Sequence, residues 1–261
     1  LRRLSEAIER GDPIVAVIRG SAVNHDGRSS GLTVPSGSAQ QEVLRAALAG
    51  AGVRPADVGM LECHGTGTPL GDPIEVHAAA QVYGEGRPAS SPLRLTAVKG
   101  TLGHLEAAAG LAGVLQAVLA LRHGVVPPNR NLTRLNPELN VEGSPLTFPT
   151  RAEPWLGDHR IAAVSAFGLS GTNAHVVIEA PPPERAAPVE RPAELVVLSA
   201  RGPTALLAVR AALARSLGNT PQHLADVAAT LATGRAHLKL RTSVVATSLD
   251  DLIEQLGLLG A

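Results

Sequence analysis

The chain has 261 residues, of which 44% are hydrophobic, so it can bury one large or two modest cores. Twenty-three basic residues balance 23 acidic ones and only 2% of residues are aromatic, which leaves neither a basic patch nor a stacking surface for nucleic acid. The single cysteine excludes an internal disulfide, and no signal-peptide pattern, zinc-ligand spacing or phosphate-binding glycine loop occurs. We therefore predict a globular cytoplasmic protein that binds no metal, nucleic acid or membrane.

The first part of the chain alternates strand-like and helical segments, which predicts an α/β layered fold. The expected elements are a strand at 14–19, a polar loop at 20–37, a helix from Ser38 that stops at Gly50 and Gly52, a strand at 58–63, a helix after Asp72, a strand at 93–99 and a helix at 107–121. Ser38 with Gln41 has the pattern of a capping box, and Asp72 with Glu75 matches the start of the next helix.

The helix at 107–121 is shorter than the roughly 20 residues that span a bilayer, so we expect it to lie in the core. Its glycines, Gly110 and Gly113, should let it pack closely against a sheet. Two more strands are expected at 161–166 and 175–180, around a turn at 167–173.

The composition changes at residues 181–192, which contain five prolines and several charges and predict an extended linker. The expected elements beyond it are a strand at 195–199, helices at 203–217 and 223–233, a strand at 241–246 and a helix from about Leu249. We therefore predict domains at 1–181 and 193–261, joined by the linker 182–192. The second is a small α+β domain without a cluster of catalytic residue types, which favours a spacer role.

Glycine-flanked polar residues stand at the predicted strand ends, where α/β folds place active sites. His64 opens a glycine-rich loop in which Thr66 and Thr68 offer hydroxyls to a polar thioester or amide arm. Lys99 and His104 share one strand-to-helix turn, where the helix dipole favours a neutral imidazole that donates a hydrogen bond. Structural roles remain open alternatives: His64 as a turn cap, and Lys99 as half of a surface salt bridge.

Two further features are interpreted as non-catalytic. Residues 27–31 fit the G-x-S-x-G pattern of serine hydrolases, but they lie in a polar loop instead of between a strand and a helix. Cys63 directly precedes His64 on a strand, where adjacent side chains point to opposite faces. We therefore expect Cys63 to face away from the site that His64 serves and not to act as a nucleophile.

Several motifs occur together in one order along the chain: Asn24-His25-Asp26-Gly27, His64-Gly65-Thr66-Gly67-Thr68, Gly71-Asp72-Pro73, Val98-Lys99 through Gly103-His104, Glu106 to Gly110, and Gly171-Thr172-Asn173-Ala174-His175. In this combination, residues 1–181 resemble the β-ketoacyl synthases, specifically the ketosynthase domains of modular type I polyketide synthases. The remainder resembles the linker domain between ketosynthase and acyltransferase, notably at 198–201 and 231–235.

The resemblance implies the C-terminal half of a thiolase-like layered α/β/α/β/α fold, followed by the small α+β linker domain. It also implies an acyltransferase reaction, a decarboxylative Claisen condensation of an acyl thioester with a malonyl-type extender. No tightly bound cofactor is implied, because the extender arrives on the phosphopantetheine arm of an acyl carrier protein. The implied partners are this carrier protein, the N-terminal half of the ketosynthase, an adjacent acyltransferase domain and a second copy in an intact homodimer.

The same resemblance assigns roles to individual residues. His64 and His104 correspond to the histidines that hydrogen-bond the malonyl thioester oxygen and stabilise its developing negative charge. Lys99 corresponds to a lysine that orders this cluster, through a carboxylate such as Glu75. Thr66 and Thr68 correspond to hydroxyls that contact the phosphopantetheine arm.

The sequence departs from the family pattern in ways that limit these assignments. The nucleophilic cysteine of the family lies upstream of every motif found here, and the chain starts without Met in a helical pattern, so we interpret it as a fragment that is incomplete for condensation. Gly100-Thr101-Leu102 replaces the frequent Ser-Asn-Ile, and Leu169 replaces a phenylalanine that gates the malonyl site in relatives. A fragment of this kind is expected to be poorly stable alone, because the helix at 107–121 would be exposed.

Two alternative functions remain open at the level of sequence. The chain could be a non-catalytic fragment that docks a carrier protein or another domain. It could also decarboxylate malonyl thioesters without condensation, because the histidines and not the cysteine stabilise the enolate.

Overall fold

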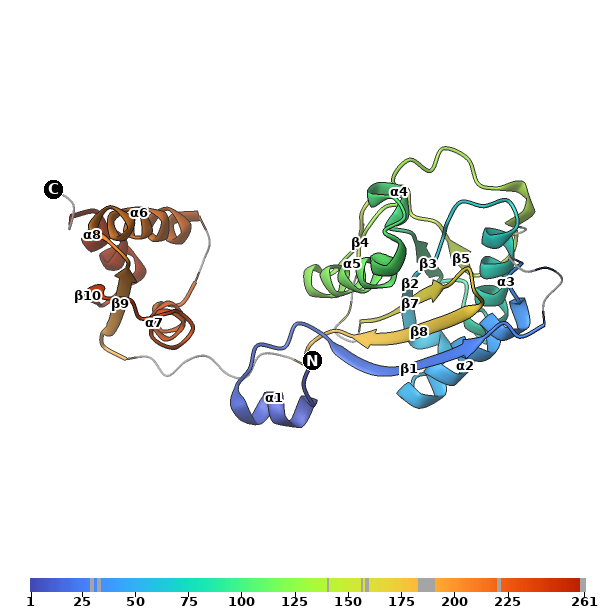
Figure 1. Cartoon of the computed structure of the whole chain (residues 1–261), viewed down its shortest axis with the longest axis horizontal. Helices are drawn as coiled ribbons and strands as arrows, with labels where there is room; N and C mark the ends of the chain where they lie inside the picture. The colour runs from blue at the N-terminus through green and yellow to red at the C-terminus, as the bar shows by residue number, and fades with distance from the viewer. Residues whose placement is uncertain are drawn as a thin grey trace. The chain divides into compact units, whose positions relative to one another are not determined.

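The computed structural model describes residues 1–28, 31, 34–139, 141–155, 157, 160–182, 191–219 and 222–258. The chain divides into two compact units, Leu1–Pro183 and Glu184–Ala261 (Figure 1). The predicted boundaries lie close to this division but stay a prediction, because linker residues 183–190 are outside the described residues. Ser29 and Ser30, the centre of the G-x-S-x-G segment, are also outside them.

A six-stranded mixed sheet with the strand order β1-β8-β7-β2-β3-β5 forms the centre of the first unit. Its strands are β1 (Val17–His25), β2 (Val58–Glu62), β3 (Leu93–Thr96), β5 (Leu146–Thr147), β7 (Ile161–Phe167) and β8 (Thr172–Glu179), and β4 (Val125–Val126) pairs separately with β6 (Glu153–Pro154). Strands β7, β2, β3 and β5 are parallel, whereas β1 and β7 each pair antiparallel with β8. Because β2 and β3 are parallel neighbours, the loops that follow them meet at one edge of the sheet.

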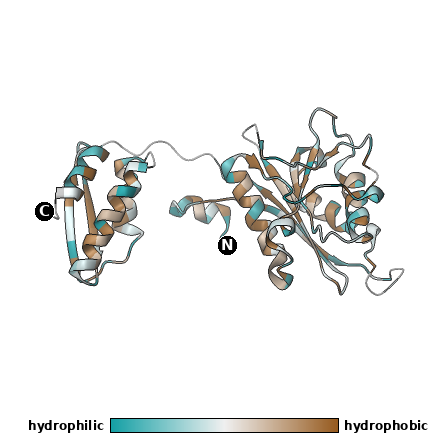
Figure 2. Cartoon of the chain, turned by 90° about the horizontal axis from the view of Figure 1, so that it is seen from above, coloured by the Kyte–Doolittle hydropathy of each residue, from teal (hydrophilic) through white to brown (hydrophobic). Residues whose placement is uncertain are grey.

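Helices cover both faces of this sheet. The helices of the unit are α1 (Leu4–Arg10), α2 (Gly37–Ala51), α3 (Gly71–Tyr83), α4 (Lys99–Leu102) and α5 (Ala109–His123), with 3₁₀ turns η1 (Pro55–Asp57), η2 (Glu106–Ala108) and η3 (Pro137–Leu139). Alternate strand residues divide between two cores: Ala163 and Val177 pack with α2 and α3, and Ala162 and Ile178 pack with α5. Figure 2 shows the hydrophobic residues gathered on the strands between these helices.

The N-terminal cap of α2 lies two residues before the predicted one. Ser36 has an extended backbone, and its Oγ accepts a hydrogen bond from Ala39 N at 3.3 Å. Ser38 already lies inside the helix, so the predicted capping box of Ser38 and Gln41 was wrong. The predicted end at Gly52 is confirmed, because this residue adopts the left-handed conformation with φ of 63°.

Strand β1 runs through residues that were predicted to form a polar loop. It is an edge strand, and its backbone pairs with β8 as far as His25. Because the sheet hydrogen bonds come from the backbone, they can form whether the side chains of the strand are polar or apolar. Gly20 sits where α2 crosses this strand. A Cβ atom at Gly20 would lie 2.6 Å from Ala51 N, so that only glycine fits.

The helix predicted at 107–121 is present as α5. A Cβ atom at Gly113 would lie 2.9 Å from Val164 Cγ1 of β7, which confirms the predicted close packing against the sheet. Burial is limited to one face, however: Leu111, Leu115 and Leu119 are 68%, 63% and 53% exposed. Their spacing of four residues aligns them as one leucine stripe. Among the described helices, none is long and apolar enough to cross a bilayer.

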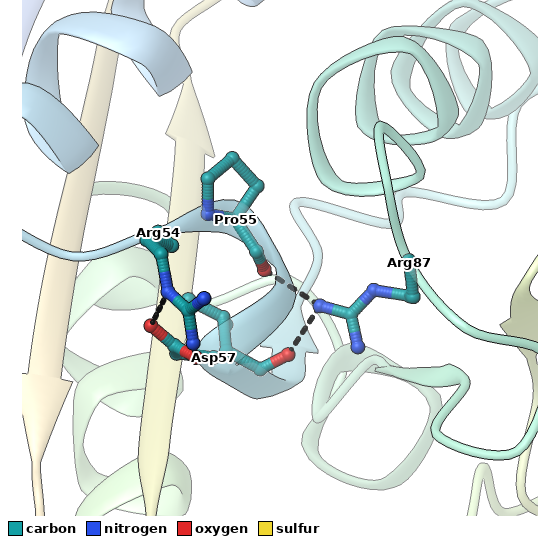
Figure 3. Close-up of polar contacts among 5 residues, drawn as sticks. Arg54, Pro55, Asp57 and Arg87 are labelled. Carbon is teal, nitrogen blue, oxygen red and sulfur yellow. Dashed lines mark hydrogen bonds and ion pairs between the residues drawn. The ribbon is translucent and has the colours of Figure 1, made fainter.

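Arg87 joins the segment after α3 to the start of β2 (Figure 3). Its Nη2 donates to the carbonyl oxygens of Pro55 and Val58, each at 2.6 Å, and only 7% of the residue is exposed. The neighbouring pair Arg54 and Asp57 lies at the surface, with 2.6 Å between Nη2 and Oδ1. Arg87 therefore anchors the chain through buried carbonyl groups beside an exposed ion pair.

The second unit has its own hydrophobic core. Its elements are β9 (Glu194–Ala200), α6 (Pro203–Asn219), α7 (Leu224–Thr233), β10 (Leu240–Ala246) and α8 (Leu249–Leu258). The two strands pair antiparallel, and Val196, Leu198, Val244 and Leu252 pack together with the helices. All five predicted elements of this unit are confirmed, which makes it the small α+β module expected from the sequence.

Candidate active site

His64 and His104 lie side by side although they come from different elements. His64 follows β2, and His104 follows α4 and precedes η2. Their ring centroids are 5.5 Å apart, and the ring planes meet at 81°. The ring of Phe167, the last residue of β7, lies 5.8 Å from that of His64. The loops after two parallel strands thus bring two imidazoles together.

Backbone N–H groups fix which ring nitrogen carries the proton. Phe167 N donates to His64 Nδ1 at 3.3 Å, and Glu106 N donates to His104 Nδ1 at 2.9 Å. An imidazole that accepts at Nδ1 is neutral and holds its proton on Nε2. In this hydrogen-bond arrangement, each ring of the histidine pair accepts at Nδ1 and has Nε2–H as its donor.

The electrostatic surroundings of His64 favour the same state. Burial, followed by the nearby Lys99 and His104, lowers its pKa to about 4. The helix dipole predicted to act on His104 is not close to this ring, because α5 begins only at Ala109 and the dipole acts mainly within a helix's first turn. The N–H group of Glu106 sets this ring instead.

Two acidic side chains hold the glycine-rich loop. Glu75 is buried on α3, and it accepts from His64 N at 2.6 Å and from Gly65 N at 2.9 Å. Asp72 accepts from Gly67 N at 3.1 Å. Asp72 and Glu75 were predicted as the N-cap and the third residue (N3) of the next helix. These positions were wrong, because α3 starts at Gly71. Asp72 lies inside the first turn, and both carboxylates bind the loop before the helix.

Burial raises the pKa of Glu75 to about 7, although its two backbone N–H donors act in the opposite direction. The loop itself depends on glycine at one tight position: Gly65 has φ of 47°, and a Cβ atom there would lie 2.8 Å from Ala97 Cβ. The His64 backbone is therefore fixed by a buried carboxyl group and a close contact with the turn after β3.

Lys99 begins the short helix α4 and does not end a strand as predicted, because β3 stops at Thr96. Burial lowers its pKa, and the negative charges of Glu75 and then Glu62 oppose this shift. Lys99 therefore interacts electrostatically with two buried carboxyl groups near the histidine pair. Its role in ordering the pair stays a prediction.

Glu62 is a buried acid that the sequence interpretation missed. It is 1% exposed and accepts from Thr96 Oγ1 at 2.7 Å, Val98 N at 2.6 Å and Gln116 Nε2 at 3.1 Å. Burial raises its pKa. The available signal was a charged residue inside the apolar run 58–63, since carboxylates are rarely buried without a specific reason. Glu62 fixes the start of the turn that carries the lysine.

Thr66 and Thr68, the two threonines of the loop that follows His64, are exposed. Thr68 Oγ1 accepts from Gly71 N at 3.1 Å and keeps its hydroxyl proton free to donate. The predicted contact of Thr66 and Thr68 with a phosphopantetheine arm stays a prediction. Leu169, which the resemblance aligned with a gating phenylalanine, is 80% exposed, and its effect on gating stays a prediction.

Cys63 lies on the other side of the strand end. It is buried, burial raises its pKa well above the ordinary value, and it lines a cavity of about 590 Å³. The cavity is also lined by Glu75, Leu95, Asn129 and Phe148, but neither His64 nor His104 lines it. The residues that line this cavity thus include Cys63 but neither histidine of the pair.

Comparison with solved structures gives the class of protein. The fold is thiolase-like, shared with the oxazolomycin ketosynthase domain of Streptomyces albus (TM-score 0.86, 37% identity) and with the ketosynthase of module 6 of the bacillaene synthase from Bacillus subtilis (TM-score 0.84, 38% identity). Each comparison covers 98% of this chain and 46% or 47% of the other. The chain therefore spans about half the length of these ketosynthases.

Sequence comparison gives the family. Residues 15–133 match the C-terminal domain of β-ketoacyl synthases, and residues 194–256 match the CurL-like C-terminal region of polyketide synthases. The chain is 47% identical to polyketide synthase GfsA of Streptomyces halstedii and 47% identical to erythronolide synthase EryA2 of Saccharopolyspora erythraea. These matches cover 99% and 94% of this chain but 4% and 7% of the relatives. The chain belongs to the ketosynthases of modular polyketide synthases and corresponds to their C-terminal part.

Proposed function

We propose that this chain provides the decarboxylation and enolate-stabilising site of a polyketide synthase ketosynthase. The observation that carries the proposal is the histidine pair, in which each Nδ1 accepts a backbone N–H and each Nε2–H is left to donate. Two neutral donors 5.5 Å apart, measured between ring centroids, suit a single oxygen that gains negative charge.

The chemistry follows from these donors. The bond between the carboxylate and the α-carbon of a malonyl thioester breaks, carbon dioxide leaves, and the electron pair moves into an enolate with its charge on the thioester oxygen. Hydrogen bonds from His64 and His104 to that oxygen strengthen as the charge develops. Preorganised donors of this kind typically contribute about 3 kcal/mol each to stabilising the transition state.

The extender is proposed to arrive on the phosphopantetheine arm of an acyl carrier protein. The exposed hydroxyls of Thr66 and Thr68 fit an arm that carries amide groups, because a hydroxyl can both donate to a carbonyl and accept from an N–H. Lys99 is proposed to position the pair through its attraction to Glu75, which holds the His64 backbone.

Condensation is proposed to need the N-terminal half of a ketosynthase, which would supply the nucleophile. Two observations support this: Cys63 lines a cavity that neither histidine of the pair lines, and the leucine stripe of α5 is exposed. An apolar stripe of this kind is typical of a helix that packs against another element. We further propose transfer of the acyl chain by the assembled enzyme, a homodimer in the intact protein, and a neighbouring acyltransferase domain beyond the second unit.

The test is carbon dioxide release from malonyl-loaded carrier protein by the complete ketosynthase that contains this chain. Replacing His64 or His104 by alanine should lower the rate constant about 100-fold or more. His223→Ala, at an exposed histidine before α7 whose side chain makes no cap hydrogen bond, is the matched control and should leave the rate unchanged. Full activity in both site variants would refute the proposal. Carrier binding without any carbon dioxide release would instead favour a docking fragment.

A further inference from the structure

Three buried polar side chains form a bridge that the proposed chemistry does not use. Tyr83 Oη lies 2.6 Å from His175 Nε2, and Ser165 Oγ lies 2.9 Å from His175 Nδ1. Tyr83 and His175 are fully buried, and Ser165 is 4% exposed. Burial lowers the pKa of His175 to about 3, so the neutral ring donates with one nitrogen and accepts with the other.

The bridge joins three elements of the first unit. Tyr83 is the last residue of α3, Ser165 lies on β7, and His175 lies on β8. Ser165 and His175 are direct partners in the antiparallel register of these strands. The C-terminal end of α3 is therefore tied to the β7–β8 pair through both nitrogens of one ring.

The same two elements, α3 and β7, hold His64. Glu75 of α3 accepts from His64 N at 2.6 Å, and Phe167 N at the end of β7 donates to His64 Nδ1 at 3.3 Å. Tyr83 is about 12 Å along the helix from Glu75, given a rise of about 1.5 Å per residue. Ser165 is about 7 Å along the strand from Phe167. Movement of α3 against β7 would thus change the two contacts of His64 together.

We infer that His175 is a positioning residue for His64. Through Tyr83 and Ser165 it fixes α3 against β7, and so it keeps the Nδ1 atom of His64 as acceptor and the Nε2 atom as donor. Hydrogen-bond partners behind a functional histidine commonly set its tautomer and orientation in this way. The geometric part of this inference stands alone, and its consequence for catalysis rests on the proposed function.

A bridge that served stability alone would have a different signature. Breaking it would make the chain easier to unfold but leave the His64 ring of the folded chain unchanged. A positioning role requires that the nitrogen atoms of this ring change their protonation pattern while the chain remains folded. The decisive readout is therefore the state of the His64 imidazole, measured separately from stability.

The experiment is nuclear magnetic resonance of this chain with ¹⁵N in its nine histidines. His64→Gln identifies the His64 signals by their loss. Tyr83→Phe removes only the bridging hydroxyl, and we expect the distinct Nδ1 and Nε2 signals of His64 to shift toward their average as the two tautomers mix. Val82→Ala is the control: Val82 is adjacent on α3 and equally buried, but it is not part of the bridge.

A second variant breaks the bridge from its other end. Ser165→Ala should produce the same change at His64, and it decides the question if the Tyr83→Phe chain does not fold. His64 signals that stay unchanged in Ser165→Ala and in a folded Tyr83→Phe chain would overturn the inference. So would an equal change in Val82→Ala.

An activity measurement separates this inference from the proposed function. In the complete ketosynthase, Tyr83→Phe should lower kcat for decarboxylation about tenfold with KM unchanged, because a displaced donor weakens the transition state more than substrate binding. If His64→Ala leaves carbon dioxide release intact, the proposed function fails while the resonance result still stands. If only the resonance signals fail to respond, the positioning role fails alone.

Discussion

His64 links the chemistry of the site to the pH dependence of folding. Its pKa is lowered from 6.5 to about 4 in the folded chain, so the unfolded chain takes up a proton first as the pH falls. The contribution of neutral His64 to the free energy of unfolding is complete above about pH 6.5 and is lost as the pH falls from there to about 4. Urea unfolding of the His64→Gln chain should therefore show a smaller loss of unfolding free energy from pH 7 to pH 4 than the unchanged chain.

Glu75 has the opposite effect on the pH dependence of folding, because its pKa is raised to about 7 in the folded chain. Its contribution to the free energy of unfolding is present at low pH and is lost as the pH rises through about 7. This carboxyl group is present in both chains, so its effect cancels in the comparison. Parallel dependences of the unfolding free energy on pH in the two chains would contradict the assigned state of His64.

At the scale of elements, α5 depends on a glycine where it crosses the sheet. Gly113→Ala places a methyl group 2.9 Å from Val164 Cγ1 and 3.2 Å from Glu62 Cγ, and we expect this overpacking to lower the unfolding free energy by about 1–3 kcal/mol. Gly50→Ala, in α2 with no atom within 4 Å of the new Cβ, should instead raise it by about 0.5–1 kcal/mol. Equal effects of the two substitutions in urea unfolding would refute this packing.

The N-terminal cap of α2 can be assigned by a pair of serine variants. Ser36→Ala removes the oxygen that accepts from Ala39 N and should cost about 1 kcal/mol of unfolding free energy. Ser38→Ala, two residues on and inside the helix, should change it by only a few tenths. A larger loss for Ser38→Ala in thermal unfolding would restore the sequence-based assignment.

The elements show where sequence patterns succeed and where they stop. Apolar periodicity predicted α2, α5 and the β7–β8 pair, because burial of one face dictates both the element and its pattern. The cap of α2 was misplaced because Ser36 and Ser38 offer equivalent oxygens, and only the backbone conformation distinguishes them. The polar half of β1 was missed because backbone pairing at a sheet edge leaves little trace in the side chains.

In the candidate site, too, some features could be predicted from the sequence and others could not. The nearness of His64 to His104 was implied by the family resemblance, whereas the hydrogen-bond partners of Glu75 could not be predicted. An acid three residues into a helical pattern looks like a cap, whereas in three dimensions it reaches back to the preceding loop. Interactions between residues distant in sequence, such as Glu62 with Gln116, have no periodic signature to detect.

At the scale of the whole molecule, the leucine stripe predicts how the chain behaves alone. Replacing Leu111, Leu115 and Leu119 by glutamate should leave the fold intact, because these side chains are mostly outside the core. The variant should self-associate less in sedimentation and should no longer co-purify with a separately produced N-terminal half. Leu207→Glu, at an exposed leucine of α6, is the control and should change neither property. Retained co-purification of the triple variant would assign the N-terminal half to another surface.

The hydrogen bonds that Glu75 accepts from the main chain affect how variants of this site should be interpreted. Both of its loop partners are peptide N–H groups, which every amino acid except proline possesses. A substitution of His64 by any residue except proline therefore removes the imidazole ring but keeps both backbone hydrogen bonds to Glu75. Loss of turnover in such a variant can be attributed to the missing imidazole and not to a collapsed loop.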